Sequence, residues 1–213
     1  MKTVRIVIRG QAPMIQNRVP MAVLLGLLTG EKPPKSKKGS RTTDEIAEEH
    51  LYTFGEPGYV GLPLKNMLSC LVTAGRQVRL DGKKQLSTKD STLLTGMLSL
   101  DSEDVGVAGD EPHAKLLTPA DGSPIEKWGN VEWVTNIMRG RNPNGGEMVA
   151  ICRPLITDWA FSLTAIFDDS YMAVDKLREC FDIGGRFVGL CEFRPERKGS
   201  FGRYRIDQWE VSE

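Results

Sequence analysis

A strict alternation near the carboxyl end constrains the fold more than any other feature of this 213-residue chain. From Trp159 to Phe167, apolar side chains alternate with small or polar ones, which is typical of a strand with one buried face. Asp168-Asp169-Ser170 follows directly, and these side chains suit the first turn of a helix. Capping accounts for both aspartates, although a pair of carboxylates could also bind a metal. The pattern therefore predicts a strand that leads at once into a helix.

The other periodic segments complete an order of four strands and two helices. Apolar side chains recur at helical spacing in residues 63–75 and 170–182, whereas residues 3–9, 148–156 and 203–211 have the alternation of strands. The order is then βαββαβ, which is an α+β, ferredoxin-like (RRM-like) core with two helices on one face of a four-stranded antiparallel sheet.

The chain is expected to form a single domain over residues 1–213. Its core is expected to consist of residues 1–18, 62–79 and 128–213. Two insertions are expected, of which residues 30–60 follow the first strand and residues 80–127 precede the second. Thr42 and Glu45 predict a capping box at the start of a short helix. Residues 20–28 are expected to form a short buried helix or strand, and periodicity does not decide between them. Residues 131–139 are expected to be a strand, and 91–98 a short helix.

Composition excludes several classes of protein. Hydrophobic residues make up 40% of the chain, too many for intrinsic disorder. The longest apolar run, Met21–Leu28, is far shorter than the roughly 20 residues that span a bilayer. Charged residues interrupt the first nine positions, where a signal peptide would be apolar, so we expect a protein of the cytoplasm of a bacterial or phage-infected cell.

The chain contains none of the common catalytic motifs for nucleotide, ester or zinc chemistry. Its four cysteines are scattered without a CxxC pair, so neither a metal nor another cofactor is expected. His50 and His113 each remain a candidate general acid or base for RNA cleavage. Catalysis is nevertheless not the preferred interpretation, because a lone surface histidine usually has no such role.

Charge is balanced overall, with 28 basic and 28 acidic residues, but it is unevenly distributed. Residues 1–41 carry nine Lys or Arg and one acid, and residues 186–205 carry six and two. Residues 99–126 are acidic instead, with Asp101, Glu103, Asp104, Asp110, Glu111, Asp121 and Glu126. Such a polarised surface suits contacts with a polyanion or head-to-tail contacts between copies.

The segment 184–205, GGRFVGLCEFRPERKGSFGRYR, is the most informative. It combines five glycines, four aromatic residues and six basic residues in 22 positions. Glycines let backbone N–H groups approach an anion, basic side chains neutralise phosphates, and aromatic rings stack on bases. The composition predicts a loop that holds a single-stranded nucleic acid, and the alternative is a surface loop whose aromatic residues lie in the core.

This arrangement resembles the RAMP superfamily, the RNA-binding proteins of CRISPR effector complexes, and in particular their guide-RNA-binding backbone subunits. The segments IGGRFVGLCEFRPERKGSFGRYRIDQWEV and VRIVIRGQAPMIQNR also resemble small phage and prophage proteins. The likeness covers both ends and residues 148–211, and residues 80–127 have no counterpart. The predicted sheet also lacks the aromatic pair that RRM-type binders carry on their central strands.

The resemblance implies a non-catalytic protein that binds single-stranded RNA or DNA and assembles with itself or within a ribonucleoprotein complex, with no membrane partner. A RAMP-fold endoribonuclease and a phage assembly or anti-host protein with a protein partner are the alternatives. The implied nucleic-acid contacts are Arg5, Arg9, Asn17, Arg18, Lys35, Lys37, Lys38, Arg41, Gly184, Gly185, Arg186, Arg194, Arg197, Lys198, Gly199, Gly202 and Arg203. Such contacts to the backbone position a strand without reading its sequence.

Overall fold

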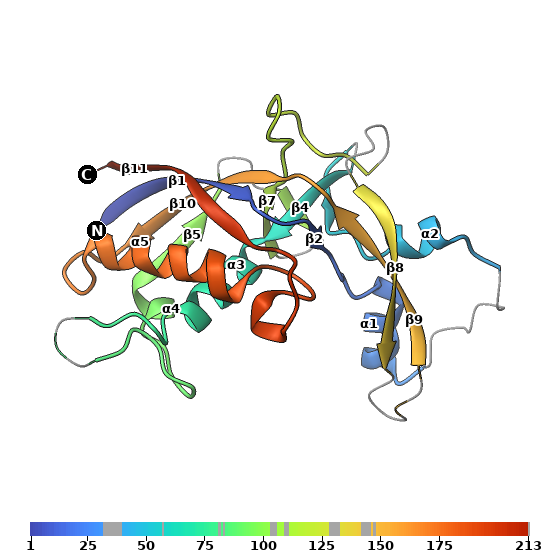
Figure 1. Ribbon diagram of the computed structural model, residues 1–213, viewed down its shortest axis with the longest axis horizontal. Helices are drawn as coiled ribbons and strands as arrows, with labels where there is room; N and C mark the ends of the chain where they lie inside the picture. The colour runs from blue at the N-terminus through green and yellow to red at the C-terminus, as the bar shows by residue number, and fades with distance from the viewer. Residues whose placement is uncertain are drawn as a thin grey trace.

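In the computed structural model, a four-stranded antiparallel sheet forms the part of the molecule that carries both termini (Figure 1). Its order is β11-β1-β10-β5, from β1 (Lys2–Gly10), β5 (Leu98–Asp101), β10 (Ala160–Phe167) and β11 (Tyr204–Ser212). The structure describes residues 1–31, 40–56, 58–80, 84–102, 106–108, 111–127, 133–141 and 148–212, together with Gly82 and Gly146. The chain is therefore an α+β protein, and three of the four sheet strands are those predicted from alternation.

Alternation gives this sheet one buried and one outer face. Val4, Ile6 and Ile8 of β1 are fully buried, and Phe161 and Phe167 of β10 are buried beside them. The residues between them face the opposite side, because successive strand side chains point to opposite faces. The outer face therefore carries the arginines of β1.

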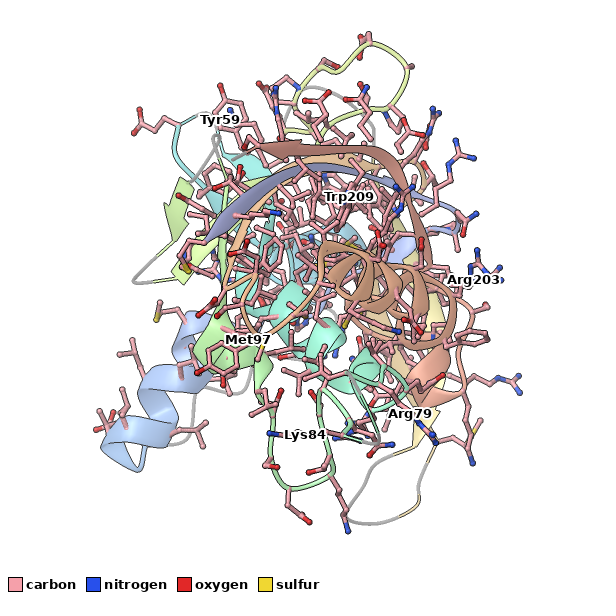
Figure 2. The ribbon with its side chains drawn as sticks, turned by 90° about the vertical axis from the view of Figure 1, so that its left-hand side faces the viewer. Tyr59, Arg79, Lys84, Met97, Arg203 and Trp209 are labelled. Atoms are coloured by element: carbon pink, nitrogen blue, oxygen red, sulfur yellow. The ribbon has the colours of Figure 1, made fainter. Side chains whose placement is uncertain are left out.

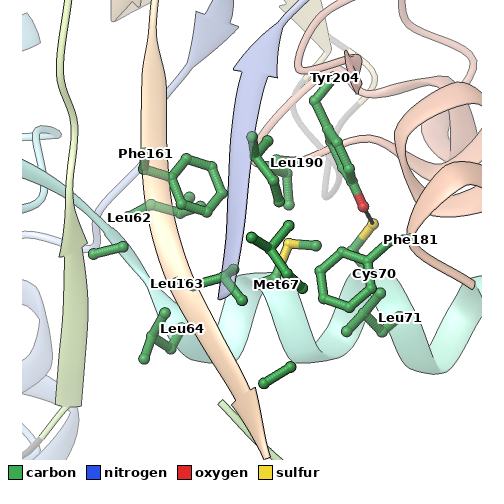
Figure 3. Close-up of a cluster of buried hydrophobic side chains, with 14 of the residues drawn as sticks. Leu62, Leu64, Met67, Cys70, Leu71, Phe161, Leu163, Phe181, Leu190 and Tyr204 are labelled. Atoms are coloured by element: carbon green, nitrogen blue, oxygen red, sulfur yellow. Dashed lines mark hydrogen bonds between the residues drawn. The ribbon is translucent and has the colours of Figure 1, made fainter. Parts of the chain in front are cut away.

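Two helices pack on the buried face, as predicted (Figure 1). They are α3 (Leu64–Ala74) and α5 (Val174–Ile183), which contact each other. α5 continues into a single π-helical turn, η1 (Gly184–Val188). Figure 3 shows the core between sheet and helices, where the Tyr204 hydroxyl of β11 lies 3.7 Å from the Cys70 sulfur of α3. The helices thus hold the start of β11 in place.

The second core strand differs from the prediction. Residues 148–156 do form a strand, β9 (Met148–Ile156), but β9 pairs with β8 (Trp133–Arg141) and β2 (Met14–Ile15) in a separate sheet. The strand beside β10 is β5, which lies inside the stretch 80–127 that was predicted to be an insertion. The first three residues of β9 are all exposed and only Pro154 and Ile156 of β9 are buried, so most of this strand has no buried face to place in the central sheet.

A third sheet, in the order β3-β4-β7-β6, joins the start of α3 to the middle of the chain. Its strands are β3 (Thr53–Phe54), β4 (Tyr59–Pro63), β6 (Gly106–Ala108) and β7 (Glu111–Lys115). β4 runs directly into α3, so this sheet fixes where α3 begins.

The remaining helices are short. α2 (Thr43–Glu48) begins with the predicted capping box of Thr42 and Glu45, and α4 (Leu94–Met97) lies within the predicted 91–98. α1 (Met21–Thr29) corrects the expectation of a buried element, because none of its residues is buried. An apolar run alone cannot show whether the fold supplies a surface to cover it. Within the described ranges, no helix has the length and apolar character needed to span a membrane.

Candidate nucleic-acid interface

The four glycines predicted to approach phosphate are used inside the fold. A Cβ on Gly184 would lie 2.5 Å from the Tyr204 hydroxyl, and a Cβ on Gly185 would overlap the backbone of the same residue. A Cβ on Gly199 or Gly202 would overlap a carbonyl group of the loop itself, that of Phe193 or of Leu190. Packing therefore accounts for all four glycines, and a candidate interface has to be built from side chains.

Residues 189–203, here called the carboxyl-terminal loop, are held by hydrogen bonds at both ends. The Gly202 amide donates to the Pro13 carbonyl at 2.8 Å, and the Leu190 amide donates to the Gly202 carbonyl at 2.9 Å. The Gln11 amide, just after β1, donates to the Arg203 carbonyl at 2.8 Å. These hydrogen bonds hold the loop against the end of β1.

Four exposed cations lie on or beside this loop: Arg186, Arg197, Lys198 and Arg203. Among the described residues, none of the four forms an ion pair. η1, which carries Arg186, contacts both the 3-10 turn of Arg197 and strand β11. The segments that carry these charges therefore adjoin one another, and Arg186 also lines a hollow with Asp175, Glu179 and Asp182 of α5.

Arg194 differs from these four, because its guanidinium is already engaged. It pairs with Glu196 at 2.7 Å and donates to the Cys191 carbonyl at 2.8 Å. Its place in the structure is to hold the loop, which competes with the predicted phosphate contact.

The outer face of the sheet gathers positive charge at the end nearest the loop. Arg9 of β1 lies directly opposite Arg205 of β11. Arg203 and Arg205 flank the buried Tyr204, so both side chains point away from the core. Figure 2 shows Arg203 projecting at the edge of the molecule. We call Arg9, Arg203 and Arg205 the arginine corner.

One carboxylate lies beside this corner. Arg205 contacts Asp207 at 3.3 Å, and both side chains are substantially exposed. Water screens such a pair strongly. The corner therefore keeps a net positive charge, and Arg205 is a residue that the sequence-based site left out.

The remaining predicted contacts are dispersed. Arg5 lies on the outer face opposite Glu210, at the other end of β1 from the corner. Asn17 donates to Glu192 at 3.2 Å, the backbone of Arg18 is bonded to that of His50, and Arg41 pairs with Glu49. Lys35, Lys37 and Lys38 lie outside the described residues. The structure thus brings Arg9 and Asn17 together with the loop, but not Arg5 or Arg41.

The two histidines have structural environments. The Nδ1 atom of His50 lies 2.8 Å from the Arg18 carbonyl, which can only accept, so Nδ1 carries the proton. The Nε2 atom is then an acceptor for the Arg153 guanidinium at 3.1 Å. Burial lowers the pKa of His50, and the neighbouring Arg153 charge adds to this. This neutral, hydrogen-bonded imidazole is poorly placed for general acid catalysis.

His113 is 3% exposed, with its ring near those of Tyr52 and Phe54 at 5.9 and 6.1 Å. A buried ring in this position has no access to a strand on the surface. Neither histidine therefore supports the endoribonuclease alternative.

Thiol and carboxylate groups offer little further chemistry. Burial raises the pKa of the Cys70 and Cys191 thiols to about 12. Asp168 accepts hydrogen bonds from the Ser170 amide and hydroxyl, which lower its pKa, but these bonds belong to a separate turn. The predicted cap is wrong, because α5 begins only at Val174 and its N-cap residue, Ala173, makes no side-chain cap bond. In the described part of the chain, no three His, Cys, Asp or Glu side chains gather as a metal site would require.

The acidic zone is partly described. Asp121 accepts hydrogen bonds from Thr118 and Ser123, and these bonds lower its pKa to about 2. This carboxylate therefore stabilises a turn and stays charged.

Of the comparisons with known proteins, the one with solved structures found similar chains. No protein-family model and no curated protein matches this chain. Among solved structures, a chain of the cryo-EM structure of the Type III-B Cmr-beta bound to cognate target RNA aligns with all of this chain, at 10% identity and a TM-score of 0.43. The alignment spans 61% of that longer chain.

Proposed function

We propose that this chain binds single-stranded RNA or DNA, without cleaving it, along a cationic surface made by the arginine corner and the carboxyl-terminal loop. The observation that carries the proposal is the position of Arg9 opposite Arg205. Like charges directly opposite each other in a sheet are destabilising, so a bound polyanion would relieve a repulsion that the free protein retains.

The preference for a single strand is supported by an exposed aromatic ring. Phe187 follows Arg186 on η1, and 59% of its surface is accessible to solvent. Bases of a single strand can stack on such a ring, whereas those of a duplex are already stacked on one another. Contacts with phosphates would position the strand without reading its sequence.

The ferredoxin-like core is part of the same proposal. Its support is the strand order β11-β1-β10-β5 together with α3 and α5 on one face (Figure 1). With β5 as the second strand, the order along the chain is βαββαβ. The outer face of this sheet is then the surface available to a single-stranded nucleic acid.

Assembly with other protein chains is a further part of the proposal, supported by α1. Six large apolar side chains on this helix, including Leu27 at 76% and Leu28 at 84%, are exposed. Exposed apolar patches of this kind mark protein contacts. A multimer along the strand or a larger ribonucleoprotein complex would cover α1.

Fluorescence anisotropy with labelled single-stranded RNA, single-stranded DNA and a matched duplex, each across a salt series, tests the proposal. Five side chains of this surface form no ion pair among the described residues and are counted as neutralising phosphates: Arg9, Arg186, Arg197, Lys198 and Arg203. Arg205 is left out of this count because Asp207 partly neutralises it. We therefore expect log K to fall against log salt with a slope of about −3.5 for a single strand. Equal binding of the duplex, or cleavage of the labelled RNA, would contradict the proposal.

A further inference from the structure

We infer that a small polar pocket beside the carboxyl-terminal loop receives one nucleobase of the bound strand, an inference that rests on the proposed function. The pocket is formed where the loop meets the chain after β2, the start of β3 and the first turn of α3. Its lining residues are Asn17, Tyr52, Asn66, Cys191, Glu192 and Arg194. We call it the loop pocket.

Size favours a single planar group as the occupant. The loop pocket has a volume of about 220 Å³, below the roughly 300–1,000 Å³ of pockets that hold drug-sized ligands. Tyr52 contributes an aromatic side chain to the wall, and aromatic rings are the usual stacking partners of unpaired bases. The other lining side chains are mostly polar, which suits the edge of a base better than an aliphatic group.

Most of the polar wall is already fixed by contacts within the protein. Glu192 accepts from Asn17 at 3.2 Å and from the Arg153 Nε at 3.2 Å. Arg194 is held by Glu196 and by the Cys191 carbonyl. A pre-organised wall of this kind loses little conformational entropy when a ligand enters.

Asn66 is the exception in this wall. Within the described residues its side-chain amide makes no hydrogen bond, although it lies at the pocket and is only partly exposed. An amide offers a donor and an acceptor side by side, and asparagine pairs in this way with the N6 and N7 atoms of adenine. Asn66 is therefore the group that would read the base.

Backbone strain in the loop supports a ligand at this position. Cys191 and Phe193 have φ values of +60° and +53°, a backbone conformation that residues other than glycine rarely adopt. These two residues flank Glu192 and precede Arg194, so the strained backbone sets where both side chains point. Strain of this kind gathers at ligand sites, where surrounding contacts enforce it.

The loop pocket and the cationic surface share one loop. Cys191, Glu192 and Arg194 form the pocket wall, and Arg197 and Lys198 follow within four residues of Arg194. A strand that lies along those cations can therefore turn one base toward the pocket. This adds sequence preference to binding that phosphate contacts alone leave unspecific.

Anisotropy with four labelled RNA 12-mers tests the inference: oligo(A), oligo(U), oligo(C) and an abasic ribose-phosphate of equal length and charge. We expect oligo(A) to bind about fivefold to a hundredfold more tightly than oligo(U) or the abasic strand. Asn66→Ala should remove that preference while leaving affinity for the abasic strand unchanged. Asn136→Ala, on the β8–β9 hairpin, is the matched control and should keep the preference.

Asn66→Asp keeps the shape of the side chain and replaces the donor by an acceptor. Because a carboxylate accepts from the N4 amino group of cytosine, the ratio of oligo(A) to oligo(C) affinity should fall in this variant. Equal affinity of the wild-type protein for all four strands would overturn the base pocket and leave the proposed function standing. No binding to any strand at low salt would overturn the proposed function itself, and the pocket with it.

Discussion

Arg9 and Arg205 face each other across β1 and β11, on the outer side of the sheet, where neither is needed for the core. At the other end of the same strand pair, Arg5 faces Glu210. On the same face of β1, one arginine therefore has a residue of like charge opposite it on β11, and the other has a residue of opposite charge. Under the proposed function, the first pair serves the ligand and the second serves the fold.

Arg9→Thr is therefore expected to raise the free energy of unfolding by about 0.2–1 kcal/mol, because it removes the repulsion with Arg205 and adds a good strand former. The same variant should bind single-stranded RNA more weakly. Arg5→Thr is the control, and its free energy of unfolding should fall or stay level because an opposite charge across the strand is lost. Urea unfolding and anisotropy measure the two effects. A less stable Arg9→Thr variant would argue against stored repulsion.

The loop cations are tested by a double variant, Arg186→Ala/Arg203→Ala. Each phosphate contact on a single strand contributes about 0.7 to the slope of log K against log salt, so the slope should become shallower by about 1.4. Arg76→Ala/Arg79→Ala removes the same charge just after α3 and should leave the slope nearly unchanged. Similar slopes for both double variants would mean that only net charge matters.

Substitution of a glycine in η1 tests whether that glycine is needed for packing or for contact with the nucleic acid. Gly185→Ala places a methyl group against the Tyr204 backbone and should destabilise the fold by about 1–3 kcal/mol. Gly96→Ala, where a Cβ meets nothing within 4 Å, should be neutral or stabilising by about 0.4–1 kcal/mol. At a temperature where Gly185→Ala is still folded, its affinity for RNA should match that of the wild type. A lower affinity of the folded variant for RNA would show that Gly185 does contribute to the nucleic-acid interface.

Local periodicity predicted the elements of this fold better than their partners. Residues 159–167 and 174–182 were predictable because their buried positions repeat at the strand and helix periods, whereas the predicted helical start at 170 was wrong because residues 170–173 form a turn before α5. β5 was not, since Leu98 and Leu100 are too few to show a period and only pairing with β10 makes the segment a strand. β9 shows the converse, because its pattern predicts a strand without saying which sheet it joins.

The candidate site shows a similar limit. A run of glycines indicates that something approaches the backbone closely, but the sequence does not distinguish Tyr204 from a phosphate. Arg205 was overlooked because its importance depends on the register that sets it opposite Arg9. Tyr52 and Asn66 gave no signal, since they reach the loop pocket only through the third sheet and the first turn of α3.

Assembly through α1 is tested by charge on its exposed face. Leu27→Glu/Leu28→Glu should leave the free energy of unfolding within about 0.5 kcal/mol of the wild type, because neither side chain is buried in the monomer. The variant should nevertheless reduce the mass of complexes measured by light scattering in the presence of a long single strand. Tyr171→Glu, at a position 71% exposed, is the control and should not change that mass. Unchanged assembly in the double variant would remove α1 from the contact.

The His50 contacts make stability depend on pH. Burial is the largest cause of the lowered pKa of His50, and its Nε2 must stay unprotonated to accept from Arg153. Below pH 6.5 the unfolded chain therefore binds more protons at this position than the folded one, so the free energy of unfolding should fall as pH drops from 7 toward 5. His50→Gln keeps a polar side chain without a titrating group. Its free energy of unfolding should fall less over the same range, as measured by urea unfolding at each pH. Parallel pH profiles for the two proteins would show that His50 titrates equally in both states and that its contact with Arg153 survives protonation.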